Sequence, residues 1–170
     1  MIDYFEWIKE DLIAVGFTED KWVIRKDAGL NEGDIIVAPA THSTNNLGYG
    51  EYVEDSRSHL KLHMHKRHDV MITLTVTNEE LKDSMYTSLK PIFQKYLGCS
   101  LEYYMGQLTV ILRGDRAIPH ALAIAEFIRI HIDPELNMLQ EKMNVAKRRL
   151  SADFTREVIK ILPNNMKSEL

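Results

Sequence analysis

The sequence predicts an α+β domain with two layers, in which helices cover one face of a mainly antiparallel sheet, followed by a helical C-terminal extension. Two observations indicate this class. Strand-like segments follow one another with short turns between them, which is the arrangement that antiparallel pairing allows. Segments whose apolar residues recur every three or four positions stand before, between and after these strands, as expected of helices packed on a sheet.

The N-terminal segment predicts one helix and two short strands. One helical face is formed by apolar residues at spacings of three and four, namely Ile2, Phe5, Ile8, Leu12 and Val15. Gly16 then ends the helix, because glycine favours the conformation found just after helices. Residues 21–26 and 34–38 are expected to be strands. A turn over residues 27–33 joins them, and Pro39 closes the second strand because proline cannot donate to a sheet ladder.

A long polar stretch and two longer strands follow. Residues 41–57 are mostly polar and contain two glycines and two asparagines, so we expect a connection that is functional or mobile. Residues 59–65 and 70–76 alternate in the way that strands require, and residues 66–69 are expected to form a hairpin turn between them.

The next helix is predicted to begin at Thr77, because Thr77 and Glu80 have the spacing of a capping box. Pro91 should kink this helix and Gly98 should end it. Its buried stripe is expected to contain Leu81, Met85, Leu89, Ile92, Phe93 and Tyr96.

A hairpin and further helices complete the chain. Residues 101–105 and 108–113 are expected to form the hairpin around Gly106. A broadly apolar helix then starts near Pro119 and runs to about His131.

The chain is expected to divide after this helix. Asp133 and Pro134 start a new helical segment, and another helix follows Ser151. We therefore divide the chain into an α+β domain, residues 1–133, and a helical extension, residues 134–170.

Composition bounds the possible classes of protein. Hydrophobic residues make up 45% and charged residues 27%, which is typical of globular proteins. No apolar run approaches the roughly 18 residues that span a bilayer, so no membrane association is expected. Cys99 is the single cysteine and has no partner for an internal disulfide, which favours a reducing compartment and a cytoplasmic location.

The net charge of −4 is distributed unevenly. Residues 1–56 hold twelve acidic and four basic side chains, whereas residues 57–76 hold four basic and one acidic. The acidic first third argues against a general nucleic-acid coat, although the basic segment leaves a local anionic ligand open.

Histidines cluster on one predicted strand. His59, Lys61, His63 and His65 should face one side of the sheet, and the apolar residues between them should face the other. These four residues are our candidate binding residues. They are compatible with a metal site, with a phosphate site, or with a solvated face that happens to contain histidine.

The triplet His63-Met64-His65 resembles the metal-binding signature of rolling-circle replication and relaxase nucleases. This resemblance implies that His63 and His65 hold a divalent metal ion, and that a tyrosine on the next helix attacks a DNA phosphate. Tyr86, with Lys90 four residues later, would take the catalytic positions. The spacing departs from the family, where tyrosine and lysine are three residues apart.

The order of helices and strands resembles the small acidic chaperones of type III secretion systems, most closely from Leu101 to Ile132. Those proteins are dimers that bind an extended segment of a partner and have no catalytic site. The resemblance implies a bacterial or phage protein without a cofactor. We therefore expect a non-catalytic protein-binding module, chaperone-like or adaptor-like, whose partner is another protein and which forms a homo-oligomer through its apolar C-terminal helices. The alternative is a metal-dependent phosphodiesterase or nuclease that uses His63 and His65.

Overall fold

A computed structural model of the chain describes residues 4–27, 34–65 and 69–146. The chain forms two compact units, Met1–Asp133 and Pro134–Leu170. In the second unit, residues 134–146 are helical. The predicted helix after Ser151 lies outside the described residues, as do residues 28–33 of the predicted turn 27–33 and residues 66–68 of the predicted turn 66–69.

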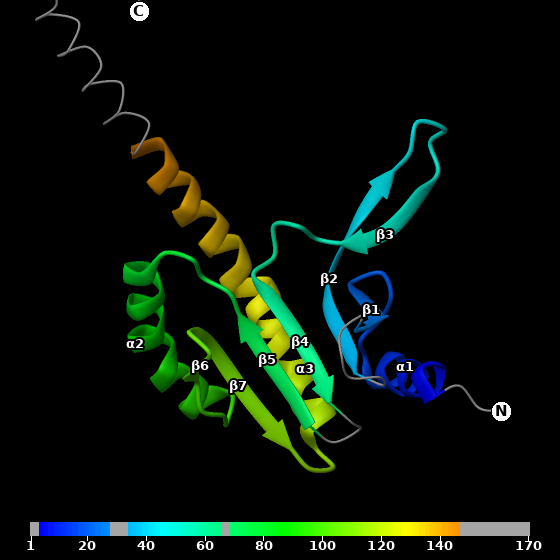
Figure 1. The fold of residues 1–170 in the computed structure, drawn as a ribbon, viewed down its shortest axis with the longest axis horizontal. Helices are drawn as coiled ribbons and strands as arrows, with labels where there is room; N and C mark the ends of the chain where they lie inside the picture. The colour runs from blue at the N-terminus through cyan, green and yellow to red at the C-terminus, as the bar shows by residue number, and fades with distance from the viewer. Residues whose placement is uncertain (1–3, 28–33, 66–68, 147–170) are drawn as a thin grey trace, which may run out of the picture. The chain divides into compact units, whose positions relative to one another are not determined.

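The first unit is built on an antiparallel sheet, so the predicted α+β class is confirmed (Figure 1). Among the described residues the sheet has seven strands, six of them in the order β1-β2-β4-β5-β7-β6, while β3 pairs only with β2. The strands are β1 (Trp22–Lys26), β2 (Ile35–Thr44), β3 (Gly50–Glu54), β4 (Leu60–His65), β5 (Asp69–Leu74), β6 (Glu102–Tyr104) and β7 (Gln107–Arg113).

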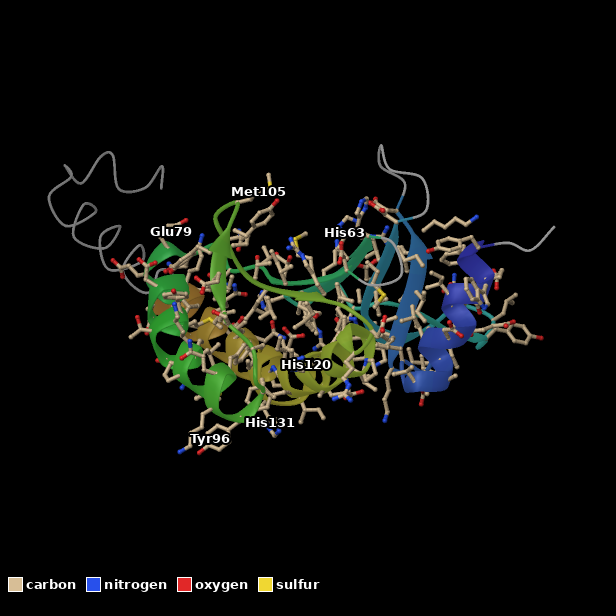
Figure 2. All side chains as sticks on the ribbon, turned by 90° about the horizontal axis from the view of Figure 1, so that it is seen from below. His63, Glu79, Tyr96, Met105, His120 and His131 are labelled. Carbon is tan, nitrogen blue, oxygen red and sulfur yellow. The ribbon has the colours of Figure 1, made fainter. Side chains whose placement is uncertain are left out.

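The helices of this unit gather on one face of the sheet. They are α1 (Tyr4–Val15), α2 (Glu79–Tyr96) and α3 (Ala117–Phe127), and α3 leads into a π-helical turn, η1 (Ile128–Ile132). Helix α3 packs against β5 and β7, and α1 packs against α3. Helix α2 reaches the same layer, since the rings of Phe93 and Phe127 lie 6.1 Å apart. In Figure 2, His120 and His131 lie on this helical side, while His63 lies on the other side of the sheet.

The alternation predicted for the histidine strand is confirmed. In β4, Leu60, Leu62 and Met64 are buried under the helices. His63 is half-buried and His65 is exposed on the opposite face. The strand therefore contributes to the core with every second residue and leaves the residues between them for another use.

Strand β2 does not end at Pro39, as the sequence predicted, but continues to Thr44. Pro39 lies where β2 changes its neighbour: β4 pairs with β2 as far as Val37, and β3 pairs with it from Ala40 onward. The missing N–H is tolerated there because the segment that follows β3 uses only the carbonyl of Pro39. This carbonyl accepts a 2.8 Å hydrogen bond from the Asp55 N–H. Much of the predicted connection 41–57 is thus a β-hairpin.

Helix α2 begins one residue later than predicted. Asn78, not Thr77, is the N-cap, and its side chain accepts a hydrogen bond of 2.9 Å from the Leu81 N–H. The predicted stripe is only partly buried, since Phe93 lies in the core but Tyr96 is 70% exposed. Lys82 is buried instead.

Burial of Lys82 is possible because its ammonium group is satisfied by hydrogen bonds. It donates to the Gly106 carbonyl at 2.7 Å and to the Glu79 carboxylate at 3.0 Å. Gly106 belongs to the predicted hairpin between β6 and β7, which the structure confirms. Lys82 therefore ties the first turn of α2 to this hairpin.

Candidate functional site

Helices α1, α2 and α3 all lie on one face of the sheet, and we call the face that they leave uncovered the open face (Figure 2). Its side chains form rows that cross β4, β5 and β7 in register. These rows are Lys61–Thr73–Thr109, His63–Met71–Ile111 and His65–Asp69–Arg113. The open face is therefore mostly polar, and the predicted binding residues Lys61, His63 and His65 all lie on it.

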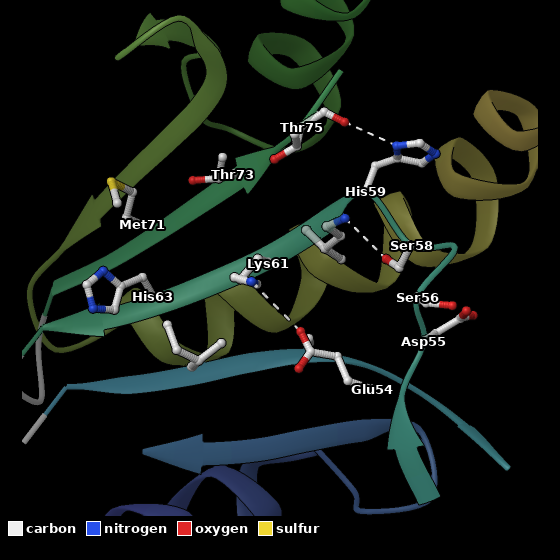
Figure 3. A pocket seen from close by; sticks show the side chains of 13 residues that line it. Glu54, Asp55, Ser56, Ser58, His59, Lys61, His63, Met71, Thr73 and Thr75 are labelled. Carbon is white, nitrogen blue, oxygen red and sulfur yellow. Dashed lines mark hydrogen bonds and ion pairs between the residues drawn. The ribbon is translucent and has the colours of Figure 1, made fainter. Parts of the chain in front are cut away.

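A pocket of about 530 Å³ opens on this face where β3 ends and β4 begins (Figure 3). Its walls come from the β3–β4 connection and from the outward side chains of β4 and β5. The predicted binding residues His59, Lys61 and His63 line it, whereas His65 does not. These three side chains share the pocket because residues two apart on a strand share a face.

Hydrogen bonds hold the walls of the pocket in place. Asp133 accepts a hydrogen bond of 2.6 Å from the Ser58 hydroxyl and one of 3.0 Å from the His59 N–H, which fixes the start of β4. His59 Nδ1 lies 3.1 Å from the Thr75 carbonyl oxygen. On the opposite wall, Lys61 forms an ion pair of 3.9 Å with Glu54. The shape of the pocket is therefore set by the fold.

Beside the pocket, two histidines meet a buried aspartate. Asp34 is only 2% exposed, and its Oδ2 atom lies 3.0 Å from His63 Nε2, while its Oδ1 atom lies 2.7 Å from His65 Nδ1. Asp27 joins them, with its Oδ2 atom 3.5 Å from His63 Nε2. Asp27, Asp34 and His63 each offer one ligand atom to a space in which these atoms lie within 4.8 Å of one another. We call Asp27, Asp34, His63 and His65 together the Asp–His cluster.

The two aspartates were missed at the level of sequence, although a signal for them exists. Asp27 is the first residue of the predicted turn 27–33 and Asp34 directly follows that turn, so an antiparallel pairing of the two predicted strands brings them together. In the structure the Asp27 N–H donates to the Asp34 carbonyl at 2.9 Å. Pairing the two predicted strands would therefore have placed the carboxylates together.

Tyr86 and Lys90 lie on the helical side of the sheet. Lys90 donates to the Tyr86 hydroxyl at 2.6 Å, which raises the pKa of Lys90. The Tyr86 ring packs 4.6 Å from Tyr103, whose strand neighbour Leu108 is buried under the helices. The structure thus brings Tyr86 and Lys90 together but separates them from the histidine pair, so the four residues do not form one site. Lys90 has a structural partner there instead.

A second exposed feature is the hairpin of β2 and β3, residues 40–54, which we call the hairpin arm (Figure 1). Three large apolar or aromatic side chains near its tip are exposed: Leu47 at 80%, Tyr49 at 73% and Tyr52 at 51%. From the sequence this stretch was expected to be part of a connection, residues 41–57, because its polar residues and glycines are equally typical of a loop.

The hairpin arm has a defined internal structure. At its tip the Asn45 side chain accepts hydrogen bonds from the N–H groups of Leu47, at 3.0 Å, and Tyr49, at 3.1 Å. Further along, the His42 ring packs edge-on against Tyr52, with ring centres 5.2 Å apart. The His42 ring also covers Gly50, where a Cβ atom would approach it to 2.1 Å, so any side chain at this position would displace the ring.

Comparison with known proteins finds no matching family model, no matching curated protein and no matching solved structure. Within the described residues, no helix is long and apolar enough to cross a membrane. We therefore argue function from the geometry of this chain.

Proposed function

We propose that this chain is a non-catalytic protein-binding module of the chaperone or adaptor kind, and that the hairpin arm contacts its partner protein. The observation that supports this proposal most strongly is the exposure of Leu47, Tyr49 and Tyr52 on one ordered hairpin. Aromatic side chains are enriched where protein interfaces gain most of their binding energy. A stable exposed group of this kind is more typical of an interaction surface than of a solvated one.

The internal bonds of the arm favour tight binding. Binding a mobile loop costs free energy, since its backbone and side chains lose conformational freedom when they are ordered. In the arm, Asn45 already fixes the tip, and the contacts of His42 with Tyr52 and Gly50 already fix the strands. The arm is therefore already ordered by folding, so a partner can bind it without a large further loss of conformational freedom.

The pocket on the open face supports binding rather than catalysis. Its polar groups are engaged with one another: Ser58 with Asp133, and Lys61 with Glu54. The Ser58 hydroxyl donates to one oxygen of Asp133, and the other oxygen accepts from the His59 N–H, so both side chains hold the start of β4. The pocket lies at the base of the arm, since Glu54 ends β3 and lines the pocket. A partner that docks on the arm can place a side chain there.

The homo-oligomer expected from the sequence stays a prediction. Helix α3 is apolar on several sides, but much of that surface is used within the unit, where Ala121, Ile124 and Ala125 are fully buried. Ile130 in η1 remains 51% exposed. Light scattering of the full chain tests this prediction: a monomer at high concentration would contradict it.

Site-specific photo-crosslinking in the native host tests the proposed function. A photo-reactive amino acid at position 49 should give one discrete cross-linked product, whose mass identifies the partner as a second copy or another protein. Met105 provides the matched control, because it also lies at a hairpin tip and is 87% exposed. The same probe at position 105 should not give this product. Absence of a product at position 49, or the same product at both positions, would contradict the proposal.

A further inference from the structure

We propose that the Asp–His cluster is a binding site for a divalent transition-metal ion of the zinc class. His63, Asp34 and Asp27 would supply the ligand atoms, and His65 would orient Asp34. This inference concerns a different part of the molecule from the hairpin arm and does not rest on the proposed protein binding. It also differs from a site made of His63 and His65 alone, because two of its three ligands are carboxylates from a neighbouring hairpin.

The distances between the ligand atoms fit a zinc ion. Zinc binds histidine nitrogen and carboxylate oxygen at about 2.0–2.1 Å, so two ligands of a tetrahedral site lie about 3.3 Å apart. His63 Nε2 lies 3.0 Å from Asp34 Oδ2 and 3.5 Å from Asp27 Oδ2. These two separations lie within a few tenths of an ångström of the required value, and all three ligand atoms lie within 4.8 Å of one another.

The backbone fixes the three ligands relative to one another. Asp27 and Asp34 directly flank the paired strands β1 and β2, and the Asp27 N–H is bonded to the Asp34 carbonyl. His63 is aligned with Ile36 of β2 through the pairing of β2 with β4. Each ligand therefore belongs to, or directly adjoins, a hydrogen-bonded strand. A site of this kind is organised before the metal arrives, which lowers the cost of binding.

Electrostatics favours a cation at this position. Asp27 and Asp34 bring two carboxylates close together, and Asp34 is nearly inaccessible to water. Two carboxylates that share a small space repel each other unless a positive charge lies between them. A divalent ion bound between Asp27 and Asp34 would supply that charge.

His65 acts as a positioning residue for Asp34. Its Nδ1 atom lies 2.7 Å from the Asp34 oxygen that does not face His63. A hydrogen bond to the second oxygen of a ligating carboxylate holds the first oxygen toward the metal, and loss of such a bond commonly costs 10–100-fold in metal affinity, in order of magnitude.

The donor set selects a class of metal. One imidazole nitrogen with two carboxylate oxygens suits zinc and neighbouring transition metals, whereas calcium requires about six to eight oxygens. Three protein ligands also leave a position of a tetrahedral zinc site for water or another ligand. Since His63 also lines the pocket, the pocket and the metal site share a side chain.

Isothermal titration of the full chain with ZnCl₂ tests the proposal, with CaCl₂ as the comparison ion. We expect one zinc ion per chain and no measurable calcium binding. His63→Ala and Asp27→Asn should each weaken zinc binding by about 100-fold or more, and His65→Ala by about 10–100-fold. Asp27 is half-buried, so Asp27→Asn keeps the test usable if a change at a more buried ligand disturbs folding.

His59→Ala is the matched control, because His59 lines the same pocket and lies outside the cluster. It should change zinc affinity by less than about threefold. Circular dichroism of each variant should show an unchanged fold. Absence of zinc binding by the unmodified chain would overturn the proposal. So would unchanged binding by folded His63→Ala and Asp27→Asn variants, or an equal loss of affinity in His59→Ala.

Discussion

The two faces of the sheet come from the same strands and differ completely in their surroundings. On the covered face, Leu62, Ile72 and Val110 form a row across three strands, and none is more than 1% exposed. On the open face, Lys61 and His63 flank Leu62 in sequence and are paired with carboxylates. Because side chains alternate between the two faces of a strand, the apolar residues of one face stabilise the fold by burial. The polar residues of the other face remain available for binding.

The largest expected difference between the faces concerns stability. Leu62→Ala should lower the free energy of unfolding by about 2–5 kcal/mol, because it leaves a cavity in a packed core. Lys61→Ala, one residue earlier, should lower it by less than about 1 kcal/mol, because its ion pair with Glu54 is largely solvated. Urea denaturation of both variants measures the difference. Equal losses would break the assignment of stability to the covered face.

A second difference concerns the reactivity of thiols. Burial raises the pKa of the Cys99 thiol to about 11. At pH 8 its reactive thiolate should therefore be about 200-fold scarcer than that of an exposed cysteine with a pKa near 8.5. The reaction with Ellman's reagent should be slow in the folded chain and should accelerate as the pH rises toward 11.

An exposed thiol on the open face provides the control for this measurement. A cysteine introduced by Thr75→Cys, in a chain that also contains Cys99→Ser, should react rapidly because Thr75 is exposed. Rapid reaction of Cys99 in the folded chain at pH 8 would show that it is not buried.

A smaller effect is expected in the hairpin arm, which belongs to neither face. Gly50→Ala should lower the free energy of unfolding by about 0.5–1.5 kcal/mol, because the new Cβ atom displaces the exposed His42 ring from its present rotamer. The same change in a His42→Ala background should cost less, since the obstructing ring is then absent. A double-mutant cycle measured by denaturation gives the coupling, and purely additive effects would exclude this packing arrangement.

Much of the covered layer could be predicted from sequence because its signals are local. The spacing of Ile8 and Leu12 identifies α1, and the alternation around Leu62 identifies β4, without knowledge of any distant contact. Errors arose where a local rule met a tertiary partner. Pro39 is a strand breaker in isolation, but the change of neighbour from β4 to β3 makes its missing N–H harmless. Lys82 is buried because Gly106, on a distant hairpin, accepts its hydrogen bond.

The candidate site could be predicted only in part, for the same reason. His59, Lys61 and His63 lie on one strand segment, so their common face follows from alternation. The Asp–His cluster instead requires the register of three strands, because Asp27, Asp34 and His63 are remote in sequence or separated by a turn. Tyr86 follows β5 on the next helix, but the sequence did not show which face that helix covers. The periodicity of one segment shows which residues share a face of that segment. A site built from several strands can be predicted only when the pairing of those strands is known.

The central claim is that the hairpin arm is a protein-binding surface, and the affinity of the cross-linked partner tests it most directly. The variant Leu47→Ser/Tyr49→Ser should bind that partner at least about tenfold more weakly than the unmodified chain, because exposed anchors of this kind commonly contribute more than 1 kcal/mol each. Its melting temperature should stay nearly unchanged, since both side chains are mostly exposed. Met105→Ser, on the other hairpin tip, should bind normally. Unchanged affinity of the arm variant, or an equal loss in Met105→Ser, would contradict the account.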